Sequence, residues 1–99
     1  MSVLAELSIA PHGKGESVSA YVARAVRLLR ESGLPCALNP MGTCIEGEWD
    51  EVMDAVSRCY RELEQDCDRI YLVLKVDCRK GATDRLHGKV QSVESKLSG

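Results

Sequence analysis

The 99-residue sequence contains no phenylalanine and one tryptophan, so its core cannot rest on large aromatic side chains. A chain of this length has room for one compact core, which must be built from aliphatic residues and cysteine. Long apolar runs are also missing, since none approaches the roughly 20 residues that a membrane span requires. Glu6 interrupts the N-terminal apolar stretch, which argues against a signal peptide. We therefore expect a single domain over residues 1–99, located in the cytoplasm and without a membrane partner.

Basic clusters interleaved with aromatic residues are absent. Thirteen Lys and Arg stand against fifteen Asp and Glu, for a net charge of -2. This balance gives no support to nucleic-acid binding. The five cysteines include no C-x-x-C pair, so neither a zinc site nor a disulfide framework is expected. We therefore interpret the cysteines as small, buried, apolar side chains of a protein in a reducing compartment.

Catalytic groupings are likewise missing from the sequence. His12 and His87 have neither a neighbouring nucleophile nor a metal-ligand partner nearby. The Gly-Lys-Gly run at residues 13–15 lacks the spacing of a phosphate-binding Walker loop. We expect no enzyme activity, no metal and no cofactor.

Two segments alternate between apolar and other residues, which is typical of strands. Residues 3–10 place Val3, Ala5, Leu7 and Ile9 on one face, and residues 69–77 do the same with Ile70, Leu72, Leu74 and Val76. Helical spacing appears from residue 18 to residue 29, after Ser17 as an N-cap and before Gly33 as a left-handed end. A second helix is predicted over residues 48–65, and a third is marked by Leu86, Val90, Val93 and Leu97.

A hairpin is predicted around Pro40, between strands at residues 34–39 and 43–46. Proline cannot donate to a strand ladder, so it marks the tip. Cys36 and Cys44 are equidistant from Pro40, and a hairpin centred there would set them opposite each other. Whether they could form a disulfide depends on the register.

The order β-α-β-β-α-β-α predicts an α+β fold of the ferredoxin-like type, with an extra C-terminal helix. Four antiparallel strands would carry the first two helices on one face and leave the other face open. The open face is predicted to hold Leu4, Glu6, Ser8, Tyr71, Val73, Lys75 and Asp77, joined by Thr43 and Ile45 through hairpin parity, with Asn39 nearby. This mixed surface suggests an interface, a ligand site or both, the alternative being a solvated sheet.

Several sequence motifs resemble those of the thiamine-binding protein family, a group of small proteins formerly classed as uncharacterised. The motifs are ELSIAP at 6–11 with Gly13, Ser17-Val18, Met41-Gly42-Thr43, EGEWDEV at 46–52, Asp68-Arg69, Lys75-Val76-Asp77 with Arg79, and Lys89-Val90 with Ser92-Val93. The resemblance spans nearly the whole chain. It implies a ferredoxin-like fold, homo-oligomers built by sheet packing, and binding of thiamine or its hydroxymethylpyrimidine part without established catalysis. Because an uncovered, partly apolar sheet gains from self-association, we expect a homodimer or homotetramer with the open sheet faces or sheet edges buried between copies.

An aminopyrimidine ring needs polar partners at its edge and apolar surfaces on its faces. The predicted ligand-binding residues on the open face are Glu6, Ser8, Asn39, Thr43, Ile45, Tyr71 and Asp77. The carboxylates, hydroxyls and amide would bind the polar edge, while Ile45 and Tyr71 would contact the ring. Two alternatives stay open: an enzyme whose site forms between subunits, and a structural or regulatory oligomer without a small ligand.

Overall fold

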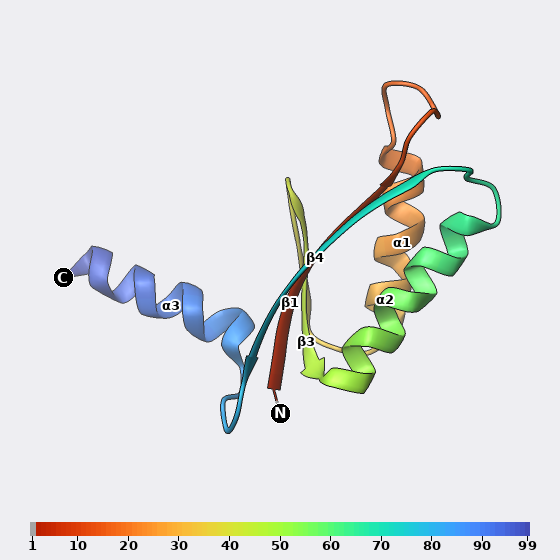
Figure 1. The fold of residues 1–99 in the computed structure, drawn as a ribbon. Coiled ribbons are helices and arrows are strands. Elements are labelled where there is room, and N and C mark those ends of the chain that lie inside the picture. Colours follow the sequence, from red (N-terminus) through yellow and green to blue (C-terminus); the bar gives the residue numbers. More distant parts are fainter. Residues whose placement is uncertain (1) are drawn as a thin grey trace.

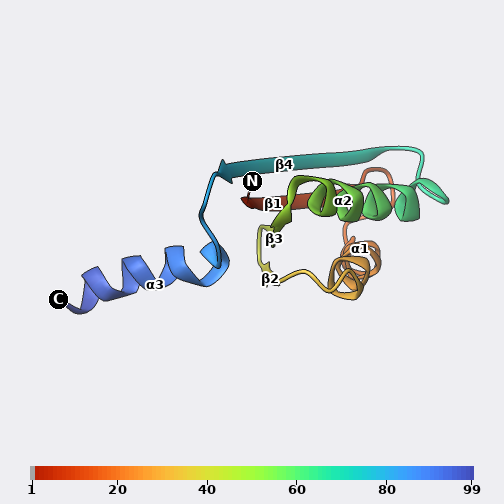
Figure 2. The ribbon, with the colours of Figure 1, turned by 90° about the horizontal axis from the view of Figure 1, so that it is seen from below.

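A four-stranded antiparallel sheet carries two helices on one face, and a third helix leads away from it (Figures 1 and 2). The computed structural model describes residues 2–99. The elements are β1 (Ser2–Pro11), α1 (Ser19–Glu31), β2 (Cys36–Asn39), β3 (Gly42–Glu48), α2 (Trp49–Glu64), β4 (Ile70–Arg79) and α3 (Arg85–Ser98). The strand order is β2-β3-β1-β4. This confirms the predicted ferredoxin-like α+β fold with an added C-terminal helix.

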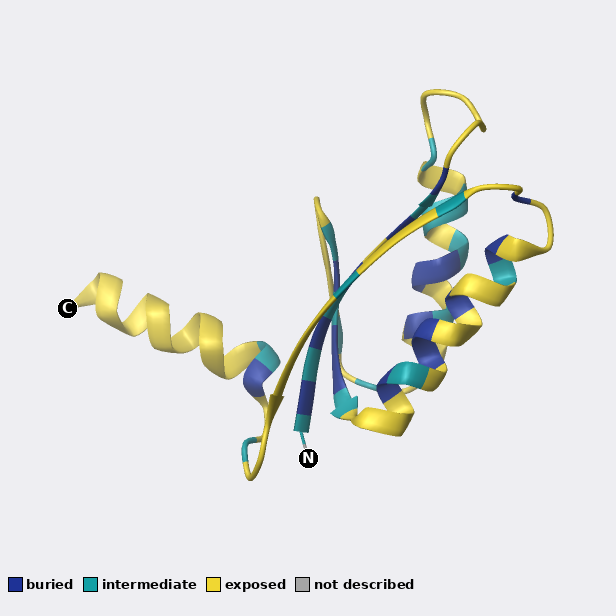
Figure 3. Cartoon of the chain, viewed as in Figure 1, coloured by how far each residue is buried: buried dark blue, intermediate teal, exposed yellow. Residues whose placement is uncertain are grey.

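Central strand β1 builds the core through its alternating side chains. Val3, Ala5 and Leu7 are almost fully buried beneath the helices, and Ile9 is 6% exposed. The register sets Ala5 beside Val76 of β4, on the same face. The predicted division of β1 and β4 into two faces is therefore confirmed. Because β4 is an edge strand, the helices cover it only partly (Figure 3).

Helix α2 closes the core with an apolar line at three- and four-residue spacing. Its buried residues are Val52, Ala55, Val56, Cys59 and Leu63. The Cys59 thiol donates to the Ala25 carbonyl of α1 over 3.3 Å. Burial raises the pKa of this thiol to about 11, so it is uncharged near neutral pH. Cys59 and Cys67 are buried, as predicted for the cysteines, whereas Cys36 and Cys44 are half-buried and Cys78 is exposed.

An arginine joins the two packed helices at their solvent-facing side. Arg24 of α1 lies 3.2 Å from the Glu62 carboxylate and 2.9 Å from the Asp66 carboxylate, both at the C-terminal end of α2. Its Nη2 also donates to the Glu62 carbonyl over 2.9 Å. These bonds join the middle of α1 to the last turn of α2 and to the residues just after it.

The helix ends agree in part with the predictions. Gly33 has φ +80°, which confirms the left-handed residue after α1. Ser17 is not the N-cap, because α1 begins at Ser19 with Val18 at its cap position. At the start of α2, the Glu51 carboxylate accepts the Glu48 N–H over 3.0 Å, so negative charge lies at this helix N-terminus as predicted.

The hairpin register differs from the prediction. Its loop holds two residues, Pro40 and Met41, so Asn39 pairs with Gly42 and Cys36 pairs with Ile45. A hairpin centred on Pro40 would shift this pairing by one residue, and such a shift moves side chains to the opposite face. Cys36 and Cys44 therefore point to opposite faces instead of facing each other, and both are free thiols.

Candidate functional site

Two surfaces are candidates for function. The first, called the open face, is the side of the sheet that α1 and α2 do not cover. Its members are Leu4, Glu6, Ser8, Asn39, Cys44, Glu46, Tyr71, Val73, Lys75 and Asp77. The second, called the crevice, lies on the helix side, between α1 and the β2–β3 hairpin.

Charged residues of the open face are already paired with one another. Glu6 lies opposite Lys75 in the register, with 3.2 Å between its Oε1 and the lysine Nζ. The Tyr71 ring contacts the His12 ring at a centroid distance of 5.5 Å. Much of this surface is therefore occupied by contacts within the chain, while Tyr71 and Val73 remain 59% and 42% exposed.

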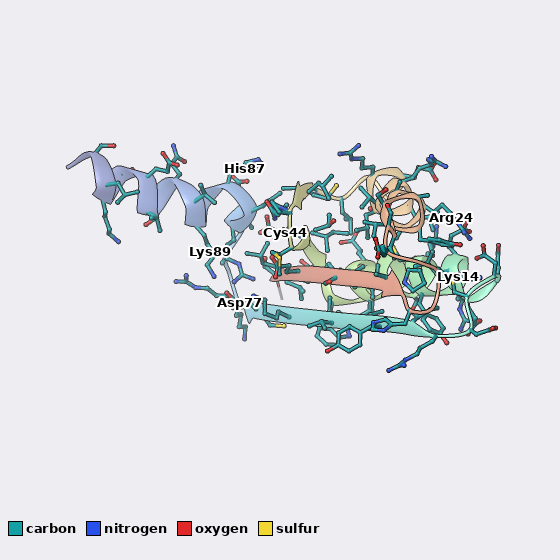
Figure 4. The ribbon with its side chains drawn as sticks, turned by 90° about the horizontal axis from the view of Figure 1, so that it is seen from above. Lys14, Arg24, Cys44, Asp77, His87 and Lys89 are labelled. Carbon is teal, nitrogen blue, oxygen red and sulfur yellow. The ribbon has the colours of Figure 1, made fainter. Side chains whose placement is uncertain are left out.

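Arg85, at the start of α3, is buried against one end of the open face. Its side chain is 7% exposed, and Nη1 lies 3.0 Å from the Asp77 carboxylate. Nη2 donates to the Ser2 carbonyl over 3.0 Å and to the Asp77 carbonyl over 2.6 Å. Lys89 adds a 2.8 Å ion pair to the same Asp77 carboxylate (Figure 4). Hydrogen bonds from Lys89 and Arg85 hold the pKa of Asp77 below its usual range.

Glu46 of β3 completes this anchor. Its carboxylate accepts the backbone N–H of Arg85 over 2.8 Å and that of Leu86 over 3.1 Å. These are donors of the first helical turn, which have no partner inside the helix. A buried carboxylate on the sheet thus caps α3 and attracts the positive end of its dipole. The first turn of α3 is fixed to the open face.

The crevice has a volume of about 1060 Å³. Its walls include Val22 and Val26 of α1 and Leu38 of β2. It continues inward to a recess of about 130 Å³ that Thr43 of β3 also lines. The rim is polar, with hydroxyls and charges from Glu16, Ser17, Ser19, Arg27, Arg30 and Glu31. An apolar slot with a polar rim suits a flat heterocycle.

Thr43 is one of the polar residues that line this recess, together with Ser8 and Asn39. It is 4% exposed, and the register with Leu7 puts it on the helix-covered face. No hydrogen bond to its hydroxyl occurs within residues 2–99. Among the described residues, the side-chain nitrogen or oxygen that is fully buried without a partner is Arg85 Nε, so the Thr43 hydroxyl keeps some contact with solvent and can bond to water or a ligand.

The structure divides the seven predicted ligand residues between two places. Five lie on the open face as predicted: Glu6, Ser8, Asn39, Tyr71 and Asp77. The placement of Thr43 and Ile45 there is wrong. Both pair with buried positions of β1, Leu7 and Ala5, and Ile45 is fully buried in the core. The cause is the two-residue hairpin loop: compared with a hairpin centred on Pro40, it turns each β3 side chain to the opposite face of the sheet.

Of the predicted site residues, Asn39 lines the crevice and its recess, and Ser8 and Thr43 line the recess, whereas the apolar walls were not predicted as part of a site. Val22 belongs to the predicted apolar stripe of the first helix, where it is indistinguishable from a core residue. A signal was nevertheless present: Val18, Val22 and Val26 recur every four residues, so the apolar surface of this helix is wider than its core contact with Ala25 and Leu29 needs. Glu46 and Arg85 gave no such signal, because their pairing joins segments 39 residues apart.

Metal sites and membrane-spanning helices were also considered for the described residues. No group of three His, Cys, Asp or Glu within residues 2–99 is arranged to hold a metal ion. Over the same residues, no helix has the length and apolar character needed to cross a membrane.

A small ferredoxin-like domain with a ligand-sized crevice is the class that this geometry defines. Comparison with known families narrows it, because residues 5–94 match the family model described as thiamine-binding protein. The chain belongs to the thiamine-binding protein family. It is 44% identical over 98 residues to a UPF0045 protein of Mycobacterium bovis, a match that covers 98% of this chain and 96% of the relative.

Solved structures agree with this assignment. A hypothetical protein of Methanocaldococcus jannaschii superimposes with a TM-score of 0.87 at 36% identity, over 94% of this chain and 96% of that one. A Thermotoga maritima protein, described as a candidate for thiamine biosynthesis or salvage, gives a TM-score of 0.79 at 26% identity, over 92% and 99% of the two chains. The predicted family is therefore confirmed.

Proposed function

We propose that this protein is a cytoplasmic, non-catalytic binder of thiamine or its hydroxymethylpyrimidine part, and that it works as a homo-oligomer. The pyrimidine ring is placed in the crevice between α1 and the β2–β3 hairpin. One observation supports this placement: the crevice combines apolar walls with an inner recess that Thr43 lines, and the Thr43 hydroxyl has no hydrogen bond within residues 2–99. Membership of the thiamine-binding protein family supports the choice of ligand.

The chemistry of an aminopyrimidine fits this slot. Its flat faces would contact Val22, Val26 and Leu38, whose burial by the ring removes apolar surface from water. Its polar edge carries an amino group and ring nitrogens, which need an acceptor and a donor at the floor. The Thr43 hydroxyl can supply both roles. Strand β2 is an edge strand with one hydrogen-bonded neighbour, so its outward peptide groups are further partners.

The open face suits the second part of the proposal, self-association. Its acidic residues Glu6 and Asp77 already hold cationic partners, so they offer little to a cationic ligand. Its exposed apolar members, Tyr71 and Val73, are what an interface between copies would cover. We therefore assign the predicted open-face residues to contacts between copies, and the ligand to the crevice.

The lining of the crevice supports the proposal of binding without catalysis. Within the described residues its walls contain no histidine, cysteine or lysine, which are the side chains that most often serve as nucleophile or base. Ser17 and Ser19 lie near the rim, where their hydroxyls are 3.4 Å apart. Neither has a histidine beside it to activate it. This lining favours recognition of a ligand over a reaction on it.

Isothermal titration calorimetry with thiamine and with hydroxymethylpyrimidine tests the ligand site. Thr43→Val preserves the shape of the side chain and removes the hydroxyl, so we expect at least a tenfold loss of affinity, about 1.4 kcal/mol. Thr83→Val, in the exposed loop before α3, is the matched control and should bind like the wild-type protein. If neither ligand binds the wild-type protein, the proposed function is wrong. Equal affinity in the Thr43→Val variant would place the site elsewhere.

A further inference from the structure

Within residues 2–99, strand β1 loses one of its two neighbouring strands before it ends. Strand β3 pairs with β1 from Ser2 to Leu7, where the last partner is Thr43. On the other side, β4 pairs with β1 as far as Pro11. Strands β1 and β4 therefore continue together past the hairpin (Figure 1). Beyond Leu7, β1 has a strand edge without a paired strand on its hairpin side.

The peptide groups that face this gap follow from a hydrogen bond of the neighbouring strand. Successive residues of an antiparallel strand point their N–H and C=O groups alternately to the two sides. The Glu46 N–H of β3 donates over 3.0 Å to the Pro35 carbonyl, just before β2. Glu46 thus points toward β2, so Ile45 next to it points toward β1, where its partner is Ala5. The two-residue alternation carries the direction of Ala5 on to Ile9, which therefore points into the gap.

The other edge of β1 gives the same assignment independently. The His12 N–H, directly after β1, donates over 2.8 Å to the Arg69 carbonyl on the β4 side. The alternation then turns Ile9 away from β4. Met41 would be the ladder partner of Ile9 if β3 continued, but it lies in the hairpin loop and is 82% exposed. Within residues 2–99, the Ile9 N–H and C=O are thus a free donor and a free acceptor, side by side on one extended residue.

The recess of the crevice lies at this gap. Ile9 lines it from β1, and Met41 and Thr43 line it from the hairpin. Its wall from α1 is apolar and includes Val22 and Val26. At about 130 Å³, the recess has room for one small ring. Ile9 is 6% exposed, so the recess is where a ligand can meet its peptide groups.

We infer that an aminopyrimidine ring in the recess pairs with the main chain of Ile9 in the way that a further strand would. The inference rests on the proposed function, from which it takes the ligand, and it names the contact that selects this ligand. The amino group donates to the Ile9 carbonyl, and the ring nitrogen beside it accepts the Ile9 N–H. A peptide that adds to an exposed sheet edge uses main-chain bonds of the same kind. The site thus selects flat rings with a donor and an acceptor on one edge.

A main-chain contact is tested best on the amide itself, by hydrogen exchange followed with NMR. In the free protein, the Ile9 amide should exchange about tenfold faster than that of Leu7 or more, because Leu7 is paired with Thr43. Saturating hydroxymethylpyrimidine should slow the Ile9 amide about tenfold or more and leave Leu7, the matched control on the same strand, unchanged. Equal protection of the two amides without ligand would show that Ile9 has a partner within the chain, and would overturn the inference.

A pair of ligands tests the donor and acceptor edge. Hydroxymethylpyrimidine is compared by calorimetry with the analogue in which a methyl group replaces the amino group. The two compounds have nearly the same shape, but the analogue cannot donate to the Ile9 carbonyl. It should bind at least about tenfold more weakly, the loss expected when one hydrogen bond is left unmade. Equal affinity of the two compounds contradicts the pairing.

The outcomes distinguish this inference from the proposed function. If hydroxymethylpyrimidine binds and the Ile9 amide is not protected, the proposed ligand is right and the pairing is wrong. The unsubstituted aminopyrimidine ring covers the opposite case. If it protects Ile9 while neither thiamine nor hydroxymethylpyrimidine binds, the pairing is right and the proposed ligand is wrong. If none of these compounds binds, both are wrong.

Discussion

The two faces of one sheet are built from the same strands but differ in how they are stabilised. On the helix-covered face, Val3, Val52 and Leu63 are fully buried and the contacts are apolar. On the open face, charged residues form the contacts, with Glu46, Asp77 and Arg85 at their centre. The first face stabilises the domain through burial, which has no direction. The second fixes one helix through hydrogen bonds, which do.

The helix-covered face thus mainly stabilises the fold, whereas the open face mainly positions α3. Apolar burial tolerates many arrangements of similar volume, so the helix-covered face specifies stability more than orientation. A buried carboxylate that accepts two particular N–H groups allows few arrangements, so the open face specifies where α3 begins and where it leads. Substitutions on the first face should therefore change global stability, and those on the second should change α3 locally.

The largest effect is expected in the core. Leu63→Ala removes a fully buried side chain from α2 and leaves a cavity beneath it. We expect the free energy of unfolding to fall by about 2–5 kcal/mol. Met41→Ala, at the hairpin tip where the side chain is 82% exposed, should change it by about 0.5 kcal/mol or less. Urea denaturation measures both, and similar losses in the two variants would contradict the contrast.

A smaller and more local effect is expected at the α3 anchor. Glu46→Gln replaces one acceptor oxygen with an amide donor, which then faces a backbone N–H of the first turn. We expect a loss of about 1–2 kcal/mol, confined to α3 and seen as faster hydrogen exchange there. Glu94→Gln, on the exposed part of α3, is the control and should exchange at the wild-type rate. Faster exchange throughout the domain would show that the anchor is not local.

The smallest effect is expected from acid, and it differs by region. Bonds from Arg24 lower the pKa of Asp66 on the helix side, and bonds from Lys89 and Arg85 lower that of Asp77 on the open face. A carboxylate with a lowered pKa stabilises the fold above its unfolded pKa of about 3.9, and this stabilisation is lost as pH falls through the lower folded value. Below about pH 4, both contacts should weaken.

NMR titration of two matched variants shows which carboxylate causes the acid transition of α3 and which causes that of the α1–α2 contact. Asp77→Asn should remove the acid transition from the amide signals of α3 and leave the α1–α2 contact titrating. Asp66→Asn should do the reverse. If Asp77→Asn left the α3 transition unchanged, another group would be responsible for it.

Much of the fold could be predicted because it depends on local periodicity. Alternation in residues 3–10 and 69–77 gave the two long strands and their faces. Gly33 marked a helix end, since few residues other than glycine tolerate its positive φ. The element order then left few arrangements besides the ferredoxin-like one, because consecutive elements pack next to each other.

For the candidate site, the sequence indicated residue types that could bind a ligand but not where these residues lie in the fold. Thr43 was predicted as a ligand-binding hydroxyl on the open face, but its side chain lies on the helix-covered face, because one residue more in the hairpin loop reverses the side to which each β3 residue points. Tertiary structure alone also decided that Glu46 caps α3, that Arg85 is buried, and that Val22 and Leu38 face a crevice. Strand and helix periods repeat over two to four residues, so the sequence determined which side chains share a face. Which faces then meet depends on contacts between segments tens of residues apart, and no local pattern records them.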